Sequence, residues 1–498
     1  MEVVAEKLEE DVSLPPNAEQ LINALRQIGY SFEQAISDIV DNCLNADARN
    51  VVVRIEYDEH AIARVLIGDD GHGMTARLLT RAMRFGAHED ASEHSLGKFG
   101  MGMKLASFSH AQTLSVSTRS AGVLSGRRWT VEGVSRNWTC EAITAGDLPS
   151  LVGHPNIETS SSGTTVAWSR VDRLKPGKNG VQPLISQLIA KLRVHLGLHF
   201  HRFLEDGRVA ISLDSRHVES DEVDRVVVVE PLNPFGYDAP GAPGFPKDFR
   251  ADLPDIGALR FSAHIWPANS TTAAYRLGNR AASRQGFYFY RNDRLIQAGG
   301  WNGLVESEAE PHTSLARVCV DLPSSMDEHF GLNVQKSLVI VPSSFVETVD
   351  KSCAKDGTRF SAYRSAAERV YRKRDLRAHS DYPLVPDGAI PVDLVRKSAE
   401  ILASGSKTRP VKISWESLDD VGALFEVDPK EMSIRIDSRI RKQLLGGRRA
   451  TATDLPFLKI LLFLLLEQDF DKSRISSNRK AYLSRVNEML RIALKHEA

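Results

Sequence analysis

The sequence has few cysteines, no long uninterrupted apolar run and no surplus of charge of either sign. Its four cysteines, Cys43, Cys140, Cys319 and Cys353, are far apart, so neither a zinc site nor a disulfide framework is indicated. Such usage fits a reducing compartment. The chain of 498 residues has 63 Lys and Arg against 64 Asp and Glu, so its global charge gives no attraction to nucleic acid or lipid.

The most apolar segment is Phe457 to Leu466, which Lys459 interrupts. It is about half as long as a membrane-spanning helix and is interpreted as a buried core helix. The acidic N-terminus has neither the basic region nor the long apolar region of a signal peptide. With 42% hydrophobic and 26% charged residues, the composition is that of an ordinary globular protein, so we expect a cytoplasmic protein with no membrane partner.

The order of the apolar patterns predicts an α+β protein of several domains. Ser31 is expected to cap a helix whose apolar residues recur with a period near 3.6, and runs of strands follow without regular βαβ alternation. A stretch rich in Pro, Gly and Lys at 175–180 marks the first boundary.

The expected organisation has four parts, the last a smaller, mostly helical α+β region with one strand pair. The second part is expected to include strands 208–213 and 225–230, and the third a helix over 351–380. The parts are residues 1–175, 176–349, 350–391 and 392–498.

An acid and an amide lie together on the second predicted helix. Asp38 and Asn42 are four residues apart, so they share one polar face of an otherwise apolar helix. A carboxylate can take a proton from water, and a carboxamide oxygen can bind a hard cation such as Mg²⁺. Taken alone, the pair is better explained by a solvated helix face.

Two glycine-rich segments follow this helix. Residues 68–74, with the sequence Gly-Asp-Asp-Gly-His-Gly-Met, come directly after a predicted strand, where glycines permit a tight turn and Asp69 can accept a hydrogen bond from an exocyclic amine. A plain Asp/Gly turn is the alternative. Residues 97–104, Gly-Lys-Phe-Gly-Met-Gly-Met-Lys, precede a short helical run, so their backbone N–H groups and two lysines can receive phosphate.

In this order, these segments resemble the nucleotide-binding motifs of the GHKL (Bergerat-fold) ATPases, which include gyrase B subunits, MutL, MORC proteins, histidine kinases and heat-shock-ninety chaperones. The family pattern is an acid, three residues and Asn; then Asp-x-Gly-x-Gly; then a Gly-rich lid end; then Gly-Thr, for which this chain has Gly163 and Thr164. The resemblance implies a GHKL α/β sandwich in the first domain, with ATP and Mg²⁺ as ligands and Mg-dependent ATP hydrolysis as the activity.

The resemblance also implies residue roles. Asp38 is the expected general base, although the family usually has the longer Glu there. Asn42 would bind Mg²⁺, Asp69 would bind the adenine amino group, and residues 80–96 would form a lid over ATP. The other expected nucleotide-binding residues are Asn45, Ala46, Gly71, Gly73, Met74, Gly97, Lys98, Phe99, Gly100, Met101, Gly102, Met103, Lys104 and Thr164.

The second unit resembles the transducer domain, with a ribosomal-protein-like fold, that follows the ATPase domain in MutL, gyrase and MORC proteins. Residues 286–296 look like its hairpin, and residues 331–337 look like the loop that lends a lysine, here Lys336, to the γ-phosphate. An exposed loop lysine is the alternative for Lys336. The resemblance covers about residues 17–345 and is closest to prokaryotic MORC-like and MutL-like proteins.

The resulting hypothesis is an ATP-binding and ATP-hydrolysing conformational switch that forms an ATP-dependent homodimer. By analogy its target is DNA in repair, topology or defence against foreign DNA, with other proteins of such a system as partners. The basic helix from Arg364 to Arg377 offers a contact to the phosphate backbone, and a solvated connecting helix is its alternative. A chaperone-like ATPase acting on protein clients, and a nucleotide-binding scaffold with weak hydrolysis because of Asp38, also remain open.

Overall fold

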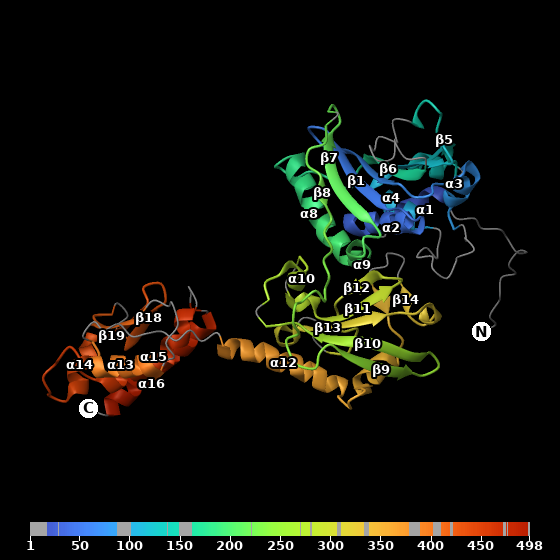
Figure 1. Ribbon diagram of the computed structural model, residues 1–498. Helices are drawn as coiled ribbons and strands as arrows, with labels where there is room; N and C mark the ends of the chain where they lie inside the picture. Colours follow the sequence, from blue (N-terminus) through green and yellow to red (C-terminus); the bar gives the residue numbers. More distant parts are fainter. Residues whose placement is uncertain are drawn as a thin grey trace, which may run out of the picture. The chain divides into compact units, whose positions relative to one another are not determined.

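The computed structural model forms two compact units, one ending at Tyr371 and the other beginning at Arg372 (Figure 1). The first unit contains an eight-stranded and a six-stranded sheet, and the second contains a three-stranded sheet with helices. This confirms the predicted α+β class. The structure describes residues 17–27, 29–86, 101–136, 138–148, 162–220, 222–268, 270–278, 281–305, 310–332, 338–377, 389–401, 410–418, 422–471, 475 and 477–496.

The large sheet has the strand order β5-β4-β3-β6-β2-β1-β7-β8. Neighbouring strands are antiparallel except for β1 and β7, which run parallel. From Val51 to Tyr57 every residue of β1 is buried, which fits a central strand. The strands are β1 (Asn50–Tyr57), β2 (Ile62–Asp69), β3 (Ala111–Ser120), β4 (Val123–Thr130), β5 (Glu141–Ala142), β6 (Gly163–Val171), β7 (Ala210–His217) and β8 (Val227–Val228).

One core joins the helices of this part to the large sheet, and it includes Ile36 and Ile39 of α2, Leu192 of α8 and Trp168 of β6. As predicted, Ser31 caps α2: its side chain accepts a hydrogen bond from Gln34 N, and the Gln34 side chain accepts one from Ser31 N, each at 3.2 Å. This capping box satisfies two of the free N–H groups at the helix start. The helices are α1 (Ala18–Leu25), α2 (Phe32–Asn45), α3 (Ala76–Ala82), α4 (Gly102–Phe108), α5 (Val131–Ser135), α8 (Val181–His199) and α9 (His201–Glu205).

The first sheet extends well beyond residue 175. Strand β7 pairs in parallel with β1 along its whole length, from Ala210 opposite Asn50 to His217 opposite Tyr57. Helix α8, which precedes β7, packs into the core of the same sheet. The expected assignment of strands 208–213 and 225–230 to a second unit is therefore wrong, because backbone pairing places both in the first sheet. The domain boundaries themselves stay a prediction.

The second sheet has the order β12-β11-β13-β10-β9-β16, and aromatic side chains such as Phe249, Phe287 and Phe360 fill its core. Its strands are β9 (Lys247–Leu253), β10 (Gly257–Ile265), β11 (Gly286–Arg291), β12 (Arg294–Ala298), β13 (Ala316–Asp321) and β16 (Cys353–Ala354), and a separate short pair consists of β14 (Gly331–Leu332) and β15 (Val339–Ile340). The helical segments are α10 (Ala273–Arg276), η1 (Ala281–Arg284), η2 (Pro311–Thr313), η3 (Ser324–Met326), α11 (Phe345–Lys351) and α12 (Phe360–Arg377).

Helix α12 begins at Phe360 and not at residue 351 as expected. Cys353 and Ala354 instead pair with β9 as strand β16. A turn then leads to Phe360, whose fully buried ring lies in the aromatic core. The correction follows from this pairing and this burial, neither of which is visible in the local sequence.

The C-terminal unit has a sheet of order β17-β19-β18, so the expected strand pair has a third member. The run from Phe457 to Leu466 is a core helix on one face only: Leu462, Phe463 and Leu466 are buried, whereas Phe457 is 81% exposed. Its elements are α13 (Val392–Ile401), β17 (Lys412–Glu416), β18 (Phe425–Asp428), β19 (Ser433–Asp437), α14 (Ser438–Leu445), α15 (Pro456–Leu466), η4 (Glu467–Asp471) and α16 (Ser477–His496). None of the helices in the described ranges combines the length and hydropathy needed to cross a bilayer.

The pairing of β1 with β7 predicts where the first sheet can be cut. A fragment of residues 1–175 lacks α8 and β7, so it should expose the buried edge of β1 and fail to unfold cooperatively. A fragment of residues 1–230 retains both and should show a cooperative thermal transition by circular dichroism. Equal cooperativity of the two fragments would contradict this account of the sheet.

Candidate functional site

Helix α2 carries buried acids in an otherwise apolar layer. Asp38 is 2% exposed, and its Oδ2 accepts a hydrogen bond of 3.0 Å from the Tyr30 hydroxyl. Burial, followed by the charge of Asp38, raises the pKa of Tyr30 far above its usual value, so the phenol remains a neutral donor. Asn42, one turn further on, is exposed. The predicted polar face therefore exists, but its acid lies inside the protein and its amide lies at the surface.

A second buried acid ends strand β2. Asp69 is 5% exposed, and its Oδ1 accepts a hydrogen bond of 2.9 Å from Gly71 N. Burial raises the pKa of Asp69 to about 6, although hydrogen bonds from Gly71, from the Cys43 thiol and from the Thr164 backbone act in the opposite direction. Asp69 is thus a buried carboxyl group that titrates close to neutral pH, which is common at functional sites.

The glycines after Asp69 allow the chain to approach its neighbours closely. A Cβ on Gly71 would lie 2.5 Å from the carbonyl oxygen of Ala46 at the end of α2. Gly73 has φ +64°, and a Cβ there would lie 1.9 Å from the carbonyl oxygen of Arg119. The backbone around Asp69 is therefore shaped by glycine at both positions. His72 N also donates to Ala46 O at 3.0 Å, which joins this turn to α2.

A hydroxyl pair connects the turn to strands β3 and β6. Thr118 Oγ1 lies 3.1 Å from Thr164 Oγ1 and accepts a hydrogen bond of 2.8 Å from Met74 N. Thr164 faces Asp69 in the register of β2 and β6. The structure thus brings together Asp69, Met74 and Thr164, three of the residues expected to bind the nucleotide.

The beginning of helix α4 lies against α2. A Cβ on Gly102 would lie 3.7 Å from Asp38 Oδ2, so the first residue of α4 is next to the buried acid. Met101 and Met103 are partly buried, whereas Lys104 is only 3% exposed. Asn45, like Asn42, is exposed, and Ala46 is partly buried. Among the remaining expected residues, Gly97, Lys98, Phe99 and Gly100 lie outside the described residues.

The segment expected to begin the lid packs against the sheet. Residues 80–82 complete helix α3, Met83 is 1% exposed, and Trp129 Nε1 donates to Met83 O at 2.9 Å. The described part of the expected lid, residues 80–86, is therefore not a free loop, because Met83 is anchored in the core. Residues 87–96 lie outside the described residues.

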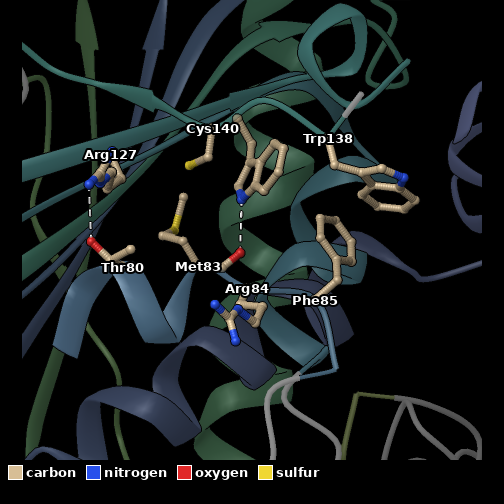
Figure 2. A pocket seen from close by; sticks show the side chains of 8 residues that line it. Thr80, Met83, Arg84, Phe85, Arg127, Trp138 and Cys140 are labelled. Carbon is tan, nitrogen blue, oxygen red and sulfur yellow. Dashed lines mark hydrogen bonds between the residues drawn. The ribbon is translucent and has the colours of Figure 1, made fainter. Parts of the chain in front are cut away.

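A pocket of about 540 Å³ adjoins this segment. Figure 2 shows Arg127 with Thr80 at one end, Trp138 with Phe85 at the other, and Cys140 between them. Burial raises the pKa of the Cys140 thiol to about 11, so this thiol is not activated as a nucleophile. The lining residues are Thr80, Met83, Arg84, Phe85, Arg127, Trp129, Trp138 and Cys140.

A buried ion pair connects helix α2, which packs on the large sheet, to the six-stranded sheet. Arg294 Nε, at the start of β12, lies 2.7 Å from Asp41 Oδ1 on α2. Lys336 itself lies outside the described residues, between strands β14 and β15. The base of that strand pair contacts β12, because the Gln297 side chain accepts a hydrogen bond of 3.0 Å from Val339 N.

No preformed metal centre stands out in the parts of the chain that the structure describes, where no three His, Cys, Asp or Glu side chains gather as a ligand set. On the basic helix α12, Arg364 forms an ion pair with Asp350 at 2.9 Å, which shows one arginine of the predicted DNA-contacting set engaged within the protein.

Sequence reasoning missed several contacts of this site. Tyr30 lies outside the periodic pattern of α2, and the donor to Asp38 was therefore not identified. Thr118 lies near the end of an ordinary strand, where a threonine carries no signal. Asp41 stood inside the recognised motif, but its partner Arg294 is 253 residues away, so only the fold reveals the pair.

The contacts of Gly73 predict a selective effect of alanine. Gly73→Ala should strongly destabilise the protein, because its Cβ would lie 1.9 Å from Arg119 O. Gly29→Ala is the matched control, since Gly29 also has φ +64° but nothing lies within 4 Å of its Cβ position. This control should lose only about 1 kcal/mol from backbone strain. The check is the midpoint of thermal unfolding, and an equal loss in both variants would show that φ alone decides.

Comparison with known proteins agrees with this arrangement. Residues 30–164 match a family model described as "Histidine kinase-, DNA gyrase B-, and HSP90-like ATPase". No curated protein matches the chain. A solved structure titled "Crystal Structure of N terminal domain of a DNA repair protein" is similar over 72% of this chain and 99% of that one, with 12% identity and a TM-score of 0.41, values too low to support a conclusion. The segment that matches the family model, residues 30–164, contains Asp38, Asp69 and Gly73.

Proposed function

We propose that the protein is an ATP-binding and ATP-hydrolysing conformational switch, with the nucleotide held at the C-terminal end of α2 and the end of β2. The observation that carries this proposal is the buried Asp69 carboxyl, next to two glycines whose Cα atoms lie against neighbouring backbone. A buried carboxylate can accept a hydrogen bond from an exocyclic amine, such as that of adenine. The family match to residues 30–164 supports the same ligand.

The adenine end of the site consists of Asp69 with its neighbours. In this proposal the ionised Asp69 accepts a hydrogen bond from the exocyclic amine, and Gly73 and Met74 line the base. Thr164 and Thr118 hold this end through their hydroxyl pair of 3.1 Å. The hydroxyls and the glycine backbone are already fixed by contacts within the protein, so binding requires little rearrangement there.

The phosphate end consists of α2 and the start of α4. Asp38 is the proposed base that takes a proton from the attacking water, and the Tyr30 hydroxyl orients its carboxylate. Asn42 offers an exposed amide oxygen one turn away, which fits an ion that keeps several of its waters. Mg²⁺ bound there would neutralise phosphate charge. The backbone from Met101 to Met103, at the N-terminus of α4, is the proposed phosphate contact.

The second sheet is the proposed transducer, and Lys336 is the proposed contact to the γ-phosphate. Two observations support this. The two sheets follow one another in this order along the chain, and Val339, three residues after Lys336, forms a hydrogen bond with Gln297 of β12. We further propose an ATP-dependent homodimer of the MORC-like or MutL-like kind, acting on DNA in repair, topology or defence. A chaperone-like ATPase acting on proteins is the second candidate, and salt-dependent binding of duplex DNA separates the two.

The pKa of Asp69 predicts how nucleotide affinity depends on pH. Because a pKa of about 6 leaves the carboxyl ionised at pH 8 and protonated at pH 5, ADP affinity should be constant above pH 7 and fall by up to about tenfold per pH unit below 6. Asp69→Asn should bind ADP about tenfold to a hundredfold more weakly at pH 7.5, since a hydrogen bond to a charged group contributes about 1.5–3 kcal/mol. Calorimetry across this pH range measures both.

The Asp69→Asn variant is also the control for ADP itself, because any pH dependence that remains in it belongs to the nucleotide. In the protein without nucleotide, protonation of Asp69 has the opposite consequence: it stabilises the folded state, whereas it weakens nucleotide binding. The folded-state pKa lies above the usual value, so the contribution of this group to stability is present below about pH 4 and is lost as the pH rises through about 6. Equal affinity of wild type and variant at pH 7.5 would remove Asp69 from the adenine site.

Variants of Asp38 and Asn42 separate chemistry from binding. Asp38→Asn should keep ATP and ADP affinity but lose about 10²–10⁴-fold in turnover, as expected for a general base. Asn42→Ala should lose the Mg²⁺-dependent part of ATP affinity and keep Mg²⁺-free ADP binding. Phosphate release and calorimetry provide the two readouts. Wild-type turnover in Asp38→Asn would mean that another group activates the water, and absence of ATP binding in the wild-type protein would refute the proposed function as a whole.

A further inference from the structure

The ion pair between Asp41 and Arg294 is buried at both ends. Asp41 is fully buried and Arg294 is 2% exposed, and the Nε–Oδ1 distance is 2.7 Å. Asp41 directly precedes Asn42, the proposed Mg²⁺ ligand, and lies three residues after Asp38 on the same helix. Arg294 begins β12, an edge strand of the second sheet. The pair therefore joins the second sheet to the part of α2 that carries the proposed chemistry.

Stability alone does not require this pair. Removing two charges from water costs several kcal/mol per ion, and apolar residues of similar volume often serve a folded protein equally well. What a buried Arg–Asp contact provides is a defined geometry, since the guanidinium is planar and its N–H groups are directional. On α2 the pair adds a directional contact at the residue directly before Asn42.

Strand β12 is itself held firmly beside this pair. The carbonyl of Leu295 lies 2.6 Å from His199 Nδ1 on α8. Burial, followed by the charge of Arg294, lowers the pKa of His199 to about 3, so the ring is neutral and Nδ1–H donates to the carbonyl. The Arg294 guanidinium also lies over the Phe200 ring at 5.4 Å. These contacts hold the start of β12, and with it Arg294, in place. The ion pair then links Asp41 to this fixed position.

The other end of β12 contacts the strand pair β14–β15. Gln297 accepts a hydrogen bond from Val339 N at 3.0 Å, and Asn302 donates one to Val339 O at 3.1 Å. Gln297 in turn donates to Asn302 Oδ1 at 2.8 Å. Strand β12 thus contacts α2 through its first residue, Arg294, and β15 through its fourth residue, Gln297.

We propose that Arg294 is a positioning residue for the metal–nucleotide site: through Asp41 it sets the orientation of Asn42 and Asp38, and it couples that orientation to the second sheet. The inference rests on the proposed function, because ATP and Mg²⁺ binding give Asn42 its task. It adds a residue outside the predicted nucleotide-binding set, and the effect of this residue on hydrolysis is indirect. Arg294 does not need to touch the nucleotide to act in this way.

The chain provides a matched control for the experiment. Arg54 and Asp214 form a second buried ion pair with the same Nε–Oδ1 distance of 2.7 Å and exposures of 3% and 4%. They join β1 to β7, which carry none of the predicted nucleotide-binding residues. A loss that comes only from breaking a buried ion pair should therefore be similar in the two pairs, whereas a positioning effect should be confined to the first.

The test compares Arg294→Met and Asp41→Asn with Arg54→Met and Asp214→Asn. All four should lower the midpoint of thermal unfolding. Only the first two should lower kcat for Mg-ATP by about tenfold to a hundredfold, the scale expected for a small misplacement of reacting groups, and raise the Mg²⁺ concentration needed for half-maximal turnover. Their Mg²⁺-free ADP affinity should stay at the wild-type value, because Asp69 is unaffected. Arg294→Lys keeps the charge without the planar group and should give an intermediate kcat.

Several outcomes would overturn the proposal. Wild-type kcat and Mg²⁺ dependence in folded Arg294→Met or Arg294→Lys would show that Arg294 positions nothing. An equal loss of kcat in the Arg54 and Asp214 variants would reduce the effect to general stability. If Arg294→Met does not fold, Arg294→Lys alone decides by the same two readouts. Failure of the wild-type protein to bind ATP would instead refute the proposed function, and is recognised by the missing ADP affinity.

Discussion

The burial of acidic groups along helix α2 is the constraint on which the rest of the first unit depends. Asp38 and Asp41 are both enclosed by the core that joins α2 to α8 and the large sheet. A buried carboxylate needs a partner, and the fold supplies Tyr30 to one and Arg294 to the other. Each partner comes from a different segment: Tyr30 precedes the helix, and Arg294 belongs to the second sheet.

Close backbone approach is the second physical theme of the site. Glycines at positions 71, 73 and 163 lie where any Cβ would meet backbone oxygen at 1.9–2.5 Å. The end of β2, the end of α2 and the start of β6 can therefore converge on Asp69, and the enclosure that results raises its pKa to about 6. Shape and protonation at this site thus have one cause.

Much of the local structure was predictable because it is encoded in neighbouring residues. Ser31 as the cap and the apolar period of α2 correctly placed that helix, and the Asp-x-Gly-x-Gly turn was correctly placed after a strand. Predictions failed where distant pairing decides. Parallel pairing of β7 with β1 moved two strands into the first sheet, and pairing of β16 with β9 delayed the start of α12. Local propensity carries no information about which strands become neighbours.

The sequence by itself determined the order of the motifs, the identity of the acids and the glycine positions, because each of these is a property of a short segment. The tertiary structure alone decided which acids are buried, that Tyr30 and Arg294 are their partners, and that the pKa of Asp69 is raised. The physical reason is that desolvation and ion pairing depend on groups brought together across the chain, up to 253 residues apart for Asp41 and Arg294, and not on the residues beside them.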